Sequence, residues 1–257
     1  MYYPIQIPYI LSKKFAAAVR YSEEVDLRLK DFVTCFWEMK NLIEQEKTIE
    51  NIIVADGCID LVADFSNKLI GFVGMSKTNF EFKITTSCRF YGARMKPGAF
   101  YALTGISAAK VMDGFLPLKV FDSDFDEGAF FRLFFDDAKI FMKEYIAQLC
   151  AGKNANDFIE LFDELSEDIP DTAESIYERL HFSPKQTQRL FAANFGLTPR
   201  VVLSIVRFQK CLEVLTSGKA SPGDVLNLVN FYDQAHFIND FKRNIGLTPF
   251  ELVRRYS

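Results

Sequence analysis

Three polar side chains in the C-terminal third of the sequence combine residue types and a spacing that suit hydrogen bonding to nucleic acid. Lys185, Gln188 and Arg189 stand at positions i, i+3 and i+4, so a helix would present them on one face. The fork of Arg189 can bind guanine O6 and N7 together, Gln188 can pair with an adenine edge, and Lys185 can reach a phosphate or a guanine. Leu190 and Phe191 would then turn toward a core. The simpler alternative is a solvated helix face that binds nothing.

A sequence repeat surrounds this face. Residues 191–199 read FAANFGLTP and residues 241–249 read FKRNIGLTP, with six of nine positions identical at an offset of 50. The same offset pairs Ser183 with Asp233, both good helix N-caps, and places Asn239 at the position of Arg189. The sequence therefore contains two copies of one helical unit.

Each copy carries the signals of two short helices joined by a tight turn. In the first copy we expect helices over 172–180 and 183–195, with an N-cap and a first-turn proline opening the second helix and a glycine ending it. In the second copy we expect them over 221–229 and 233–244. The helix between the copies, 199–216, has 18 residues and would span ~27 Å, which approaches one turn of B-DNA at ~34 Å. Such pairs are typical of helix-turn-helix units, which place their second helix in the DNA major groove.

These segments resemble the DNA-binding domain of AraC/XylS-family transcriptional regulators. The residues that carry the resemblance are SPKQTQRLF at 183–191, GLTP at 196–199, RFQ at 207–209, DQAHF at 233–237, FK at 241–242 and GLTP at 246–249. The match covers about 154–257. His181 in the first turn, and Asn230 where the family usually has glycine, depart from the pattern and concern local turn geometry.

The resemblance implies contacts to DNA from both copies. In the second helix it implies a groove-facing set of Gln234, Ala235, Ile238 and Asn239, with His236, Lys242 and Arg243 nearby. We expect Asn239 to read an adenine edge or little at all, and Lys242 and Arg243 to position the backbone. His236 could instead be a partly buried residue that orients the helix, and Arg207 either contacts a phosphate or supports the fold through an ion pair. The predicted DNA-binding residues are Lys185, Gln188, Arg189, Arg207, Gln234, His236, Asn239, Lys242 and Arg243.

The first 150 residues predict a β-rich domain. Two apolar strands are expected on either side of Asp56-Gly57, a strong hairpin signal. Further strands are expected over 69–73, 80–85 and 88–95, helical turns over 99–104 and 107–112, one long helix over 127–150, and a helix over 156–168.

The stretches DGCIDL at 56–61 and GARMKPG at 92–98 resemble the N-terminal cupin-like domain of a subset of the same family, which implies sensing or dimerisation. Most of the 27 phenylalanines lie in this part, where they either line an apolar effector pocket or fill the core. The predicted fold is α+β, with a mixed β-sheet (cupin-like) domain with helices over 1–150. An all-α domain over 154–257 follows, holding two helix-turn-helix motifs joined by a long helix.

Composition excludes several other classes. At 49% hydrophobic and 25% charged residues the chain is not intrinsically disordered, and no apolar run reaches the ~18 residues of a membrane span. Five scattered cysteines and only two histidines leave no spacing for a metal site or an imidazole-activated nucleophile, so no catalytic residue, metal or cofactor is expected. A cytoplasmic protein is expected. Its net charge of −4 predicts few phosphate contacts and a shallow salt dependence of binding.

The expected function is a transcriptional regulator whose partner is double-stranded DNA. RNA polymerase, a small-molecule effector and a second copy of the chain are candidate further partners. One alternative is an enzyme in the N-terminal domain, for which Asp60 and Asp64 are the acidic pair, although the alternation around Ile59, Leu61 and Val62 favours solvent-facing strand positions. Another is an interaction module that has lost DNA binding.

Overall fold

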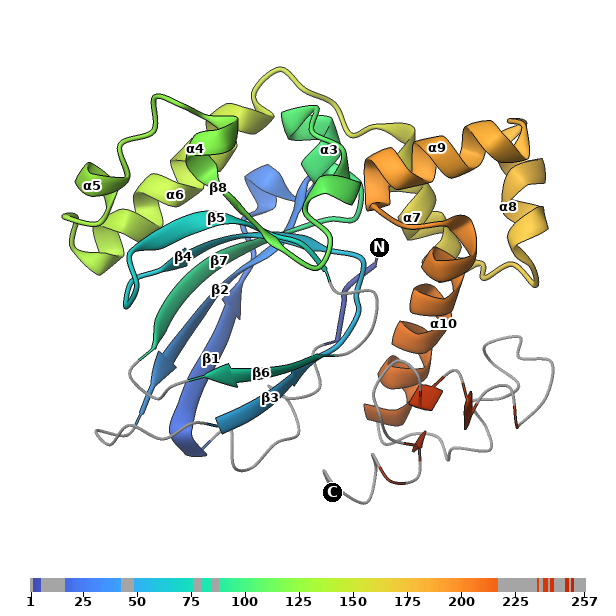
Figure 1. Cartoon of the computed structure of the whole chain (residues 1–257), viewed down its shortest axis with the longest axis horizontal. Helices are drawn as coiled ribbons and strands as arrows, with labels where there is room; N and C mark the ends of the chain where they lie inside the picture. Colours follow the sequence, from blue (N-terminus) through green and yellow to red (C-terminus); the bar gives the residue numbers. More distant parts are fainter. Residues whose placement is uncertain are drawn as a thin grey trace.

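The computed structural model describes residues 2–5, 17–42, 49–75, 80–84 and 88–216, together with positions 235, 238, 239, 241, 242, 248, 249 and 251. A six-stranded antiparallel sheet in the order β1-β2-β7-β4-β5-β8 dominates its N-terminal part. The strands are β1 (Val19–Glu24), β2 (Val33–Asn41), β4 (Ile59–Asp64), β5 (Leu69–Val73), β7 (Arg89–Met95) and β8 (Phe115–Pro117). A separate ribbon pairs β3 (Ile49–Ile53) with β6 (Phe80–Ile84) and lies across from the covering helices (Figure 1).

One face of the large sheet is covered by short helices and one long helix (Figure 1). They are η1 (Leu27–Leu29), α3 (Ala99–Thr104), η2 (Ala108–Lys110), α4 (Leu118–Phe121), α5 (Glu127–Phe130) and α6 (Phe135–Cys150). Alternate residues of β4, namely Ile59, Leu61 and Ala63, are buried in this core. Phe72 and Phe100 meet edge to face there, with ring centroids 4.9 Å apart. Phe36, Phe72, Phe100, Phe125 and Phe130 therefore fill the core, whereas Phe115, Phe134 and Phe141 are exposed.

Two expectations about this domain are wrong. The strands that flank Asp56-Gly57 form no hairpin, because β3 pairs with β6 while β4 pairs with β5 and β7. The dipeptide is a bend at which the chain changes sheets, with Gly57 at φ +83°. The Asp56 carboxylate is held by the Cys58 amide at 2.9 Å, and a Cβ on Gly57 would lie 2.8 Å from the ring of Phe162. Long-range packing thus overrides the local turn signal.

The expected helix over 127–150 is interrupted between α5 and α6. Phe130, Phe131 and Phe135 all contact Phe65, with ring centroids 5.9, 5.6 and 4.8 Å from it. On one continuous helix these three side chains would spread over ~140°. The break brings them onto one partner, and Phe134 stays extended at the start of α6.

The described stretch from 157 to 216 is helical, as expected, and contains α7 (Asp157–Glu167), α8 (Ala173–Leu180), α9 (Pro184–Phe195) and α10 (Pro199–Thr216). These helices do not form a core of their own. Their apolar residues share one cluster with Tyr2, Ala55, Cys58 and Met75, which belong to the N-terminal segment and the loops of the sheet domain. The sheet and the first helix-turn-helix unit are therefore packed as one body.

Within the described residues no single helix is long and apolar enough to cross a membrane, and α9 with α10, bent by 53°, meets that test only as a pair.

Candidate nucleic-acid interface

The α8–α9 unit is a helix-turn-helix whose ends are fixed by local caps. The Thr172 hydroxyl accepts from the Ser175 amide at the start of α8, and the Ser183 hydroxyl accepts from the Gln186 amide at the start of α9. His181 occupies the turn in the left-handed conformation, at φ 54° and ψ 25°. The departure from the family pattern at His181 therefore leaves the turn intact, with the strain that a non-glycine residue carries there. Gly196 ends α9 at φ 70°.

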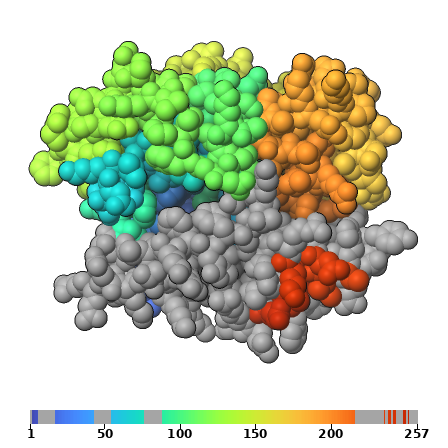
Figure 2. All heavy atoms as spheres, viewed as in Figure 1, coloured from blue at the N-terminus to red at the C-terminus, as the bar shows by residue number. Residues whose placement is uncertain are grey.

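The two faces of α9 divide as the sequence predicted, except that Leu190 is only half-buried. Lys185, Gln188 and Arg189 are exposed, and in Figure 2 α8 and α9 form the outer surface at one end of the molecule. Phe191 and Phe195 on the opposite side are buried, with ring centroids 5.1 Å apart. A polar face is thus presented to solvent by a helix whose apolar face is fixed in a core.

Two further buried polar residues hold α9, and sequence reasoning missed both. The Thr187 hydroxyl donates to the Ser183 carbonyl at 3.2 Å, and the Asn194 amide donates to the Leu190 carbonyl at 3.0 Å. Asn194 also accepts from the Asn156 side chain, the N-cap of α7, at 3.2 Å. Asn194 is one of the positions shared by the two repeats, and its identity there was the available signal.

Arg207 lies inside the helical unit rather than on its surface. It is 9% exposed, and its guanidinium donates to the carbonyls of Pro170 and Asp171 at 2.9 and 2.6 Å. These carbonyls belong to the segment that leads into α8. Of the two expected roles, the structure supports the structural one, through hydrogen bonds to backbone carbonyls, and not a phosphate contact.

The connecting helix α10 has the 18 residues that the sequence predicted. Phe208 on this helix contacts the ring of Phe241 at 5.2 Å, and Phe241 is 2% exposed. Asn239 and Lys242, on either side of Phe241 in sequence, are helical and exposed. Gln234, His236 and Arg243 lie outside the described residues.

Thr248 caps a last helical segment, which includes positions 249 and 251. The Thr248 amide and hydroxyl both donate to the Glu251 carboxylate at 2.8 Å, and the Glu251 amide donates back to the Thr248 hydroxyl at 3.2 Å. This reciprocal pattern is a capping box.

The inner end of α9 rests on the sheet domain. The Ser107 hydroxyl donates to the Ala192 carbonyl at 3.2 Å, and a Cβ on Gly196 would lie 2.4 Å from Cγ of Met112. Lys96 pairs with Asp163 of α7 at 3.1 Å. The position of the polar face of α9 is therefore set by the sheet domain, which the sequence did not reveal.

The acidic pair of the sheet domain is not a solvent-facing pair. Asp60 faces Arg94 across the β4–β7 register, and its side chain is 18% exposed. Asp64 accepts hydrogen bonds from the Ser66 amide at 2.9 Å and from Asn67, and so closes the turn after β4. The expectation of a solvent-facing position is wrong for Asp60.

Two family models match separate parts of the chain. Residues 176–255 match the family model described as a helix-turn-helix domain, and residues 26–117 match a domain of unknown function, DUF6597. No curated protein matches the sequence.

Among solved structures, a 1.65 Å structure of ToxT from Vibrio cholerae is 11% identical, with a TM-score of 0.45, over 93% of this chain and 99% of that one. ToxT bound to (E)-4-(8-methylnaphthalen-1-yl)but-3-enoic acid is 13% identical, with a TM-score of 0.43, over 93% of this chain and 98% of that one.

Proposed function

We propose that this protein, a DNA-binding transcriptional regulator with an AraC-type helix-turn-helix domain, reads its operator with two recognition helices in successive major grooves. The first is α9 and the second is the helix over 233–244. The observation that carries the proposal is the division of α9, whose polar face points outward while its apolar face is fixed in a core. The length of α10, ~27 Å, suits a connector between helices about one turn of DNA apart.

The residues of α9 have distinct roles in this proposal. Arg189 binds a guanine edge bidentately, Gln188 pairs with an adenine, and Lys185 contacts a phosphate or a guanine. In the second helix, Asn239 reads an adenine edge, and Lys242 holds the DNA backbone. Gln234 faces the groove, and Arg243 holds the DNA backbone together with Lys242. His236 either contacts the DNA or orients the helix.

The sheet domain is proposed to control this reading by sensing a small molecule or by dimerisation with a second copy of the chain. The support is the shared core, since a change in the loops of the sheet domain must repack α7 and α9. RNA polymerase as a further partner and the cytoplasm as the location belong to the same proposal. An enzyme in the sheet domain and a module that has lost DNA binding are the alternatives.

The proposal is tested by selecting bound fragments from a sheared genomic library with the purified full-length protein. Arg189→Ala is run in parallel, with Lys119→Ala on α4 of the sheet domain as a matched loss of one exposed cation. We expect a bipartite motif with segments about one helical turn apart. Arg189→Ala should weaken the free energy of binding to that site by ~1–3 kcal/mol and relax the base preference at one base pair.

Two outcomes would contradict the proposal. An equal loss on random DNA would mean that Arg189 only holds a phosphate. Absence of any enriched motif at low salt, both alone and with a metabolite extract added, would favour the interaction module.

A further inference from the structure

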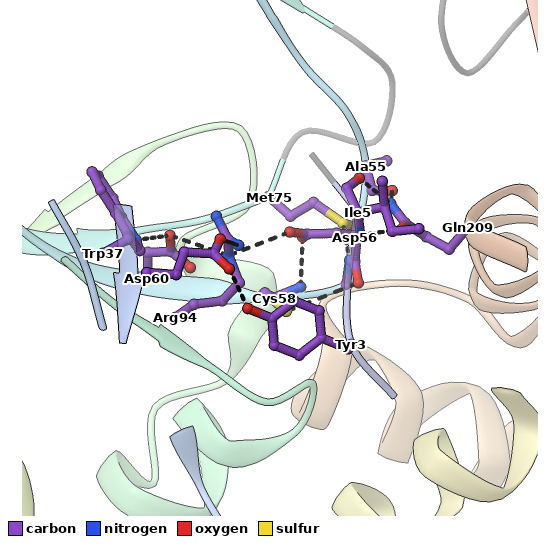
Figure 3. A network of polar contacts seen from close by, with 12 residues as sticks. Tyr3, Ile5, Trp37, Ala55, Asp56, Cys58, Asp60, Met75, Arg94 and Gln209 are labelled. Atoms are coloured by element: carbon purple, nitrogen blue, oxygen red, sulfur yellow. Dashed lines mark hydrogen bonds and ion pairs between the residues drawn. The ribbon is translucent and has the colours of Figure 1, made fainter. Parts of the chain in front are cut away.

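A buried ion cluster lies on the sheet, on the face opposite the covering helices. Arg94 of β7 is 4% exposed, and its Nη1 donates to Glu23 of β1 at 3.1 Å. Its Nε lies 3.8 Å from the carboxylate of Asp56 and 3.8 Å from that of Asp60. The indole of Trp37 donates to Asp60 at 2.8 Å (Figure 3). One guanidinium is thus shared among three carboxylates, and Nε is equally far from two of them.

Within this cluster, burial brings the pKa of the Asp60 carboxyl close to neutral pH. Burial raises its pKa from 3.8 to about 7, although Arg94 and the Trp37 hydrogen bond favour the ionised form. The titratable and charged groups around it come from every described element of the cluster. They are Tyr3 of the N-terminal segment, Tyr21 and Glu23 of β1, Cys35 of β2, Asp56 and Cys58 of the loop before β4, and Arg94 of β7.

The loop that holds Asp56 is also the contact between the sheet and α10. Gln209, on α10 and 3% exposed, donates from its amide to the Ala55 carbonyl at 3.0 Å. The same side chain accepts from the Ile5 amide at 2.8 Å, and the Tyr2 hydroxyl donates to the Asp56 carbonyl at 2.6 Å. Figure 3 shows the run of residues from Trp37 through Asp60, Arg94, Asp56 and Ala55 to Gln209. The two ends belong to the sheet and to the helix that joins the two helix-turn-helix units.

We propose that Gln209 is a positioning residue for DNA binding, and that the charge of Asp60 acts on it through Arg94 and the loop at Ala55-Asp56. This rests on the proposed function, because it names how the sheet domain controls α10. When Asp60 is ionised, it competes with Asp56 for Nε of Arg94. When Asp60 is neutral, Arg94 is left to Asp56, which holds the loop and the Ala55 carbonyl against Gln209.

A double-mutant cycle tests the coupling. Operator affinity is measured from pH 6 to pH 8 on a fragment obtained by the selection above, for the wild type, Asp60→Asn, Gln209→Met and the double variant. We expect the wild-type affinity to change about fivefold across pH 7, and Asp60→Asn to remove that change. Gln209→Met keeps the length of the side chain without its amide donors and acceptor, and should remove the change while retaining DNA binding.

A second readout needs no DNA and no operator. Amide hydrogen exchange around Gln209 in the full-length protein should slow, after correction for intrinsic rates, as the pH falls through 7. Asp60→Asn should fix the slow exchange at all pH values. Gln209→Asn serves if Gln209→Met does not fold, because it keeps a neutral amide and shortens its reach to Ala55 and Ile5.

Independent effects of the two substitutions on affinity, together with exchange that does not change with pH, would overturn the coupling. A protein that binds no duplex but shows the pH-dependent exchange would refute the proposed function and leave the coupling standing. If Gln209→Met binds the operator with the same pH dependence as the wild type, the coupling is refuted and the proposed function stands.

Discussion

Replacing Gly196 with alanine tests whether the first helix-turn-helix unit is seated on the sheet domain. Gly196 ends α9 at φ +70°, and a Cβ there would lie 2.4 Å from Cγ of Met112, 2.6 Å from its Sδ and 3.1 Å from the backbone carbon of Ala108. Gly105 is the matched control. It ends α3 at φ +69°, but a Cβ there would meet nothing within 4 Å.

The two substitutions share one cost and differ in another. Holding alanine in the left-handed conformation costs about 1 kcal/mol at either position. At Gly196 the new methyl group also overpacks a contact between the two parts of the chain, which typically costs about 1–3 kcal/mol more. Met112 is flexible and can yield in part, whereas the backbone of Ala108 cannot. We therefore expect a loss of about 1 kcal/mol for Gly105→Ala and about 2–4 kcal/mol for Gly196→Ala.

Urea unfolding followed by circular dichroism measures both losses, and Met112→Ala provides the internal check. Removing Cγ and Sδ of Met112 should return much of the excess loss in the Gly196→Ala background. Equal losses for the two glycine variants, or an excess that Met112→Ala leaves unchanged, would show that α9 is not seated on the sheet domain as described.

Four further changes have defined outcomes. Because the folded-state pKa of Asp60 is raised from 3.8 to about 7, its contribution to stability is complete below pH 4 and is lost as the pH rises through 7. Asp60→Asn should therefore raise the free energy of unfolding at pH 8, by at most about 4 kcal/mol at ~1.4 kcal/mol for each pH unit, and the gain should shrink by pH 5. Arg207→Leu should lower the free energy of unfolding, measured by thermal denaturation, by about 2–3 kcal/mol. It should leave the salt slope of DNA binding unchanged, because the side chain is buried against backbone carbonyls. Phe241→Ala should lower the free energy of unfolding by about 3 kcal/mol, because it removes the contact to Phe208. In gel-shift titrations it should weaken binding to a bipartite operator more than binding to the first half-site alone. If Lys185 contacts a phosphate, Lys185→Ala should weaken binding to all sequences alike and reduce the salt slope by ~1. If Lys185 contacts a guanine, the substitution should instead relax the base preference at one position.

The ends of the C-terminal helices could be predicted closely because residues next to each end, such as N-caps, prolines and glycines, determine where a helix begins and stops. Ser183 with Pro184 begins α9, Gly196 ends it, and the structure follows these signals. The exposed face of Lys185, Gln188 and Arg189 could be predicted for the same reason, since a helical repeat fixes which residues share a face. Capping bonds and helical periodicity act over four residues or fewer, so they do not depend on the rest of the fold.

The sequence by itself thus determined the α10 connector, the two-copy organisation and the outward polar face of α9. The partners of each strand, the bend at Asp56-Gly57, the burial of Asp60 beside Arg94, the inward position of Arg207 and the seat of α9 on the sheet were decided only by the tertiary structure. Most of these depend on residues tens of positions apart, as Arg207 and Pro170 are. A polar side chain on an alternating strand has the same local pattern whether its face meets water or a buried guanidinium. Only the packing of the whole chain distinguishes the two.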